Sequence, residues 1–209
     1  MRIASLVILC LALASSPAWA NWTYNNGPIN GTTDAWTINF GYVVSDTFIA
    51  GGPVTGFQFG VWEFPGDVLS SVDWSITTQE NGGTVLGSGT ASGKNLTDQF
   101  ISTNQFGYDI DLISVSGLNV AASSGTEYWL NLQNAAVPSG DPVFWDENSG
   151  AGCKGTGCPS LASESAVGTI ASEAFTISGS GTTTPEPSSI LLFGSGILGL
   201  AGVLRRKLS

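Results

Sequence analysis

The chain has 209 residues, of which 16 are acidic, 6 are basic and none is histidine. This length suits one domain with processing segments, and the net charge of -10 repels phosphate backbones, so nucleic acid is not expected as a partner. The absence of histidine excludes Ser-His-Asp and Cys-His catalysis and the usual zinc sites.

The first 20 residues predict a secretory signal peptide. Arg2 precedes an apolar run, and the small-residue triplet Ala18-Trp19-Ala20 ends the segment. The apolar run is too short to span a membrane permanently, which distinguishes it from an anchor. We expect signal peptidase to cut between Ala20 and Asn21.

Residues 21–178 predict one all-β domain. Apolar and polar residues alternate with a period of two in the runs 35–42, 71–76, 108–112 and 127–134. The first run places four apolar side chains on one face: Trp36, Ile38, Phe40 and Tyr42. Many short strands separated by Gly, Pro, Asn and Ser clusters favour an antiparallel β-sandwich of the jelly-roll type. The polar segment 179–184 predicts a flexible linker.

Two cysteines of the predicted mature chain stand close together. Cys153 and Cys158 are separated by four residues, and an exported protein folds in an oxidising compartment. The sequence therefore predicts a disulfide between them, worth about 2 kcal/mol by the chain-entropy estimate.

The segment around residue 145 carries oxygen ligands of the kind that calcium prefers. Asp141, Asp146, Glu147 and Asn148 lie within eight residues of one another, without the spacing of a defined calcium motif. Calcium is the one cofactor that the sequence suggests, and a solvated acidic loop is the alternative.

Glycan binding is the sharper hypothesis for the domain. Trp129 shares a predicted strand face with Asn131 and Gln133, and Trp145 follows nearby. Aromatic rings beside amide groups suit a sugar, although each tryptophan also suits the core. The alternative is a carbohydrate-active enzyme with paired carboxylates, for which Glu63, Asp73, Glu127 and Glu147 are candidates without a distinguishing spacing. We expect no enzymatic activity.

The tail 185–209 combines three unlike features. Pro185-Glu186-Pro187 comes first, a glycine-rich apolar segment of about 188–204 predicts a transmembrane helix, and Arg205-Arg206-Lys207 would stay in the cytoplasm. In this order, the features resemble the PEP-CTERM sorting signal of exported bacterial proteins. The resemblance implies processing near Pro-Glu-Pro by an exosortase, a membrane-embedded cysteine transpeptidase. It also implies a role alongside exopolysaccharide at the cell surface or in the extracellular matrix, after anchoring of the precursor in the membrane.

Overall fold

The computed structural model describes residues 21–150 and 157–181, all within the compact unit Asn21–Gly181. Thirteen strands and one short 3-10 helix, η1 (Gly93–Asn95), make up its regular structure. Within these ranges no helix is long and apolar enough to cross a membrane. The predicted signal peptide and the predicted transmembrane segment lie outside the described residues.

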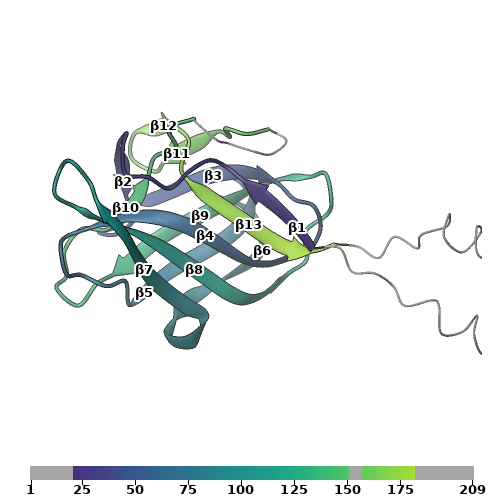
Figure 1. Ribbon diagram of the computed structural model, residues 1–209. Helices are drawn as coiled ribbons and strands as arrows, with labels where there is room; N and C mark the ends of the chain where they lie inside the picture. The colour runs from purple at the N-terminus through teal and green to yellow at the C-terminus, as the bar shows by residue number, and fades with distance from the viewer. Residues whose placement is uncertain (1–20, 151–156, 182–209) are drawn as a thin grey trace, which may run out of the picture. The chain divides into compact units, whose positions relative to one another are not determined.

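The first sheet has seven strands built around β4 (Figure 1). Its members are β1 (Asn21–Asn25), β2 (Ala35–Thr37), β4 (Val54–Glu63), β7 (Leu96–Thr103), β8 (Asp109–Val120), β10 (Phe144–Asp146) and β13 (Phe175–Ser180). β4 pairs with β13 and then β10 along one edge, and with β8 along the other. β1 extends the sheet from β13, β2 from β10 and β7 from β8, and every pairing is antiparallel.

The second sheet has six strands in the order β12-β11-β3-β9-β5-β6, again all antiparallel. Its members are β3 (Val43–Ile49), β5 (Ser71–Gln79), β6 (Gly82–Ser92), β9 (Glu127–Ala136), β11 (Ala162–Glu164) and β12 (Gly168–Ile170). This confirms the prediction that the domain is all-β and antiparallel.

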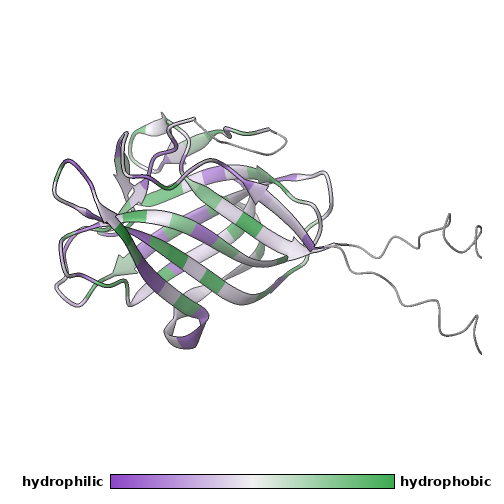
Figure 2. Cartoon of the chain, viewed as in Figure 1, coloured by the Kyte–Doolittle hydropathy of each residue, from purple (hydrophilic) through white to green (hydrophobic). Residues whose placement is uncertain are grey.

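One hydrophobic core joins the two sheets. Phe57 on β4 meets Trp74 on β5 at a ring-centroid distance of 6.1 Å, and Tyr24 on β1 meets Phe48 on β3 at 6.3 Å. Figure 2 shows apolar and polar residues alternating along the long strands, as expected when one strand face is buried. Each buried aromatic or aliphatic side chain contributes about 1.5–3 kcal/mol, so this shared core holds the sheets together.

The strands predicted over residues 71–76 and 127–134 are confirmed. Val72, Trp74 and Ile76 are buried on β5, and Leu130 and Leu132 are buried on β9. Their polar neighbours lie on the outer face of the second sheet.

The strand predicted over residues 35–42 is wrong in its second half. β2 ends at Thr37, and the backbone turns with a hydrogen bond from Tyr42 N to Asn39 O. Phe40 and Gly41 take φ values of 56° and 90°, which no strand allows. Phe40 and Tyr42 are therefore exposed instead of sharing the buried face of Ile38.

The run 108–112 lies at the start of β8, where its polar face turns inward. Asp111 pairs with Val61, a core residue, whereas Ile110 pairs with Trp62 on the opposite face. Asp111 is 4 % exposed. Apolar side chains cover both faces of the sheet here, which a period of two cannot reveal.

Candidate functional site

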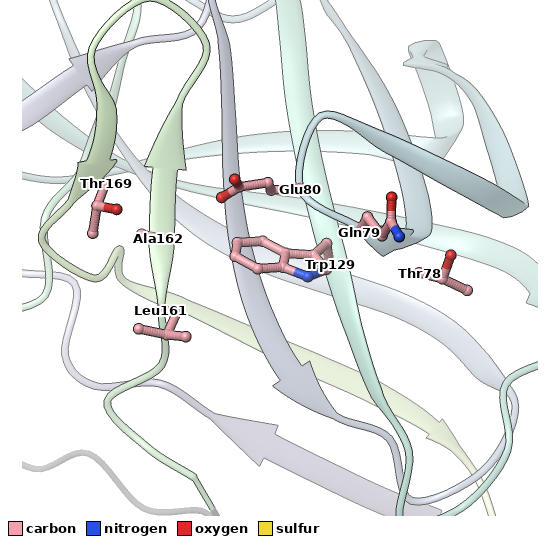
Figure 3. Close-up of a pocket in the computed structure, with 7 residues that line it drawn as sticks. All are labelled: Thr78, Gln79, Glu80, Trp129, Leu161, Ala162 and Thr169. Atoms are coloured by element: carbon pink, nitrogen blue, oxygen red, sulfur yellow. The ribbon is translucent and has the colours of Figure 1, made fainter.

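The outer face of the second sheet carries an open hollow of about 510 Å³. Trp129 lies at its centre, on β9 between Thr47 of β3 and Thr77 of β5. Figure 3 shows the indole ring between the end of β5 on one side and the β11–β12 hairpin on the other. The other lining residues are Thr78, Gln79, Glu80, Leu161, Ala162 and Thr169.

The surroundings of Trp129 combine an apolar floor with a polar rim. The indole is half-buried, while Thr78, Gln79, Glu80 and Thr169 are exposed. These residues offer hydroxyl, amide and carboxylate groups around one ring face. Such a hollow can hold a flat molecule that has an apolar face and hydroxyl groups at its edge.

Asn131 lies on the same strand face, but the prediction that it contacts a glycan is wrong. It is 3 % exposed, and its Oδ1 accepts hydrogen bonds from Ser45 Oγ at 2.6 Å and Asn81 N at 3.1 Å. Its Nδ2 donates to Thr77 Oγ1 at 2.8 Å. The amide makes these bonds within the protein and holds the β5–β6 turn against the sheet. Asn131 therefore supports the hollow without lining it. Gln133 stays half-buried on the outer face and does not line the hollow.

Trp145 is also excluded from surface contact, because it is 0 % exposed. The ring packs edge-on against Phe59 at 6.0 Å and Phe175 at 5.7 Å, and its Nε1 donates to Ala174 O at 3.1 Å. The stretch 144–146 forms β10 between β4 and β2, where the sequence predicted an acidic loop. Trp145 is therefore a core residue, and the prediction that it contacts a glycan is wrong.

The four residues predicted as calcium ligands do not point to a common centre. Asp146 accepts hydrogen bonds from Trp62 Nε1 at 2.7 Å and Asn30 N at 2.9 Å, and Asn148 Oδ1 accepts from Gly150 N at 2.6 Å. Across residues 21–150 and 157–181, no three acidic or cysteine side chains form a metal-binding group. Calcium binding stays a prediction without a ligand geometry among these residues.

The acids considered for a catalytic pair lie apart. In the second sheet, Asp73 pairs with Gln133 and Glu127 with Ile49, near opposite ends of β9. In the first sheet, Glu63 is the last residue of β4 and Glu147 follows β10. Among the described residues, Glu80 is the one acidic residue that lines the Trp129 hollow.

Sequence reasoning missed an acidic cluster at the end of β4. Glu63 is 0 % exposed and neither carboxyl oxygen has a hydrogen-bond partner. Burial raises its pKa to about 8, and the neighbouring charges of Asp98 and Asp111 add to the effect. Burial likewise raises the pKa of Asp111 to about 6. Glu63 therefore carries a proton at neutral pH.

A second buried carboxylate lies on β3 and is well satisfied. Asp46 accepts hydrogen bonds from Ser160 Oγ, from Ser172 Oγ at 3.1 Å and from Glu173 N at 2.6 Å. Burial raises its pKa to about 7 although these donors oppose the shift. This network fastens the segment after residue 157 to β3, which is a structural role.

Several predicted sites lie outside the described residues. They are Cys153 of the predicted disulfide, Ala20 of the cleavage site, and the motif residues Pro185, Glu186, Pro187, Arg205, Arg206 and Lys207. Cys158 and Asn21 are described: Cys158 packs against the core, and Asn21 begins β1. The disulfide and the cleavage position stay predictions.

Comparison with known proteins gives a match in the tail. No curated protein and no solved structure matches the chain. Residues 183–207 match the family model of the PEP-CTERM protein-sorting motif, which confirms the resemblance in the sequence. The motif implies export, a membrane-anchored precursor and an exosortase as the processing partner. This chain is therefore a protein that carries the PEP-CTERM sorting motif at its C-terminus.

Proposed function

We propose that the protein is a noncatalytic component of the cell surface or extracellular matrix that associates with neutral polysaccharide through the Trp129 hollow. The half-buried indole of Trp129 carries the proposal, because it offers one flat apolar face in an open, polar-rimmed depression. A sugar ring stacks on such a face while its hydroxyl groups reach Gln79, Glu80 and Thr169. No cofactor is required for this interaction.

The strand pairing supports a jelly-roll sandwich as the carrier of the hollow. Eight strands pair as β1-β13-β4-β8 in one sheet and β3-β9-β5-β6 in the other. Consecutive strands β3 and β4 belong to different sheets, as do β4 and β5, and as do β8 and β9. The Trp129 hollow lies on the outer face of the second sheet, and we expect an extended polymer to lie along this face.

Carboxylate geometry supports a binding role over hydrolysis. A glycosidase needs two carboxyl groups about 5–10 Å apart across a cleft. Within the described ranges Glu80 supplies the one carboxylate that lines the hollow, and the protonated Glu63 is 0 % exposed on the core side of the other sheet. A neutral polymer that reaches Trp129 therefore meets one of the two groups that hydrolysis requires.

The sorting motif accounts for how the protein would reach the cell surface or the extracellular matrix. Signal peptidase removes residues 1–20, and the tail then holds the precursor in the membrane. The exosortase finally cuts near Pro185-Glu186-Pro187. The two prolines favour an extended backbone that a protease cleft accepts.

A glycan panel tests the proposal directly. The full-length protein in detergent is incubated with neutral polysaccharides, and both its retention and the release of reducing ends are measured. We expect retention without release, and at least a fivefold weaker affinity for Trp129→Ala. Phe100→Ala is the matched control, because Phe100 is 58 % exposed on β7 of the other sheet. Release of reducing ends would instead establish an enzyme, and unchanged retention of Trp129→Ala would reject the hollow as the site.

A further inference from the structure

Four loops meet at the end of the compact unit opposite its chain termini. They are 38–42, 64–70, 104–108 and 137–143, here called the four-loop end. β4 runs from Val54, which pairs with Gly179, to Glu63, which pairs with Asp109 at the start of β8. Ten residues of strand separate the two ends by about 30 Å. Whatever the four-loop end contacts therefore lies away from the point where the tail leaves the domain.

Hydrogen bonds tie three of these loops and the first residue of β8 into one surface. The bonds run from Gly66 N to Asp109 Oδ2 at 3.3 Å, from Ser139 Oγ to Asp67 Oδ2 at 2.8 Å, and from Asn39 Nδ2 to Asp141 O at 3.0 Å. The loops consequently present their side chains in a fixed arrangement.

Three of the four loops expose a large apolar side chain. The exposed fractions are 64 % for Phe40, 38 % for Phe64, 57 % for Val68 and 57 % for Phe106. Phe106 stacks on the buried Trp62 with a ring-centroid distance of 5.6 Å and an interplanar angle of 23°. Phe64 meets Tyr108 edge-on at 5.1 Å. The rings thus form supported platforms with one face open.

Phe40 is held outward at a cost in backbone energy. Its φ of 56° lies in the left-handed region, which a bulky residue occupies at a cost of about 1–2 kcal/mol. Its side chain gains little burial in return. A strained backbone that exposes an aromatic ring indicates that the exposed ring itself is used.

The charge of this surface has one sign. Asp67, Asp109 and Asp141 are half-exposed beside the rings. None of the four loops contains lysine or arginine. Aromatic faces and carboxylates together attract an ammonium group, by cation–π and by direct electrostatic interaction.

We propose that the four-loop end binds a polysaccharide with free amino groups, such as a chain of glucosamine units. Each unit offers an ammonium group for the carboxylates and a ring face for Phe106 or Phe40. A basic peptide fits less well, because loop tips offer no strand edge for main-chain pairing. This site does not depend on the Trp129 hollow, which lies on a sheet face and suits neutral sugars.

Two polymers with the same sugar backbone test the proposal. Affinity of the full-length protein in detergent is measured for a β-linked glucosamine polymer and for its N-acetylated counterpart. We expect at least tenfold tighter binding of the free amine, and loss of that preference when NaCl is raised from about 50 mM to about 500 mM. Equal affinity for both polymers would overturn the proposal, as would equally tight binding of polylysine.

Substitutions locate the site. Phe106→Ala is expected to weaken binding of the glucosamine polymer about fivefold, and Phe40→Gly similarly while relieving backbone strain. Phe100→Ala should leave it unchanged. If Phe106→Ala fails to fold, Phe40→Gly still decides the question. Unchanged binding by Phe40→Gly would reject the four-loop end.

Discussion

Glu63 buries both carboxyl oxygens without a donor, so replacing it with glutamine should change how stability depends on pH. The pKa of Glu63 is about 8 in the fold, against an ordinary value of 4.5. Because the folded pKa is raised, the proton's contribution to stability is complete below the ordinary value and is lost as the pH rises towards 8. Each pH unit in that window removes about 1.4 kcal/mol, giving about 4 kcal/mol between about pH 5 and about pH 8.

Urea unfolding followed by tryptophan fluorescence measures this loss at both pH values. Glu63→Gln keeps the shape of the neutral carboxyl but cannot titrate. Between about pH 5 and about pH 8, the free energy of unfolding of the variant should therefore fall by about 4 kcal/mol less than that of the native protein. Asp46 titrates in both proteins, and its contribution cancels in the comparison. Glu127→Gln, at an exposed position, is the control and should follow the native protein. Identical losses in the native protein and in Glu63→Gln would refute the reasoning.

Three further substitutions test other features of the fold. Trp145→Ala should destabilise the protein by about 3–5 kcal/mol in urea unfolding, because it opens a cavity in the core, whereas Trp129→Ala should cost much less. Asn131→Ala should cost about 1–3 kcal/mol by leaving buried partners unpaired, with Gln133→Ala as a milder comparison, and similar losses would contradict the network. Phe40→Gly should leave the melting temperature unchanged or higher, since it relieves a left-handed backbone; a clear decrease would show that the Phe40 ring stabilises the fold.

The strands that face water on one side were predictable from the sequence. Val72, Trp74 and Ile76 alternate with polar residues, and one buried face explains the pattern. The same rule fails at the start of β8, where Ile110 and Asp111 are both buried on opposite faces. Gly31 lies against Ile110 and the Phe106 ring stacks on Trp62, so the outer face is covered there as well. Alternation within one strand does not reveal this cover.

The candidate site was predictable only at Trp129. Trp129 and Trp145 have similar polar neighbours in the sequence, yet one lines a surface hollow and the other is in the core. Their difference arises from β10 pairing with β4 and β2, which are more than 80 residues away in the chain. Likewise, the four-loop end gathers residues from 38 to 143, and only the topology brings them together.

The position of β13 between β1 and β4 links the timing of folding to that of sorting. With the predicted signal peptide at the N-terminus, β1 would cross the membrane first and β13 last, and the two strands pair from Asn21 with Ser180 to Asn25 with Thr176 (Figure 1). The first sheet cannot close until β13 has been translocated, because β13 supplies the partner for two strands at once. The sorting motif begins at residue 183, directly after this strand. Completion of the sheet and arrival of the sorting motif at the membrane are therefore nearly simultaneous, and a chain truncated before residue 175 would lack both.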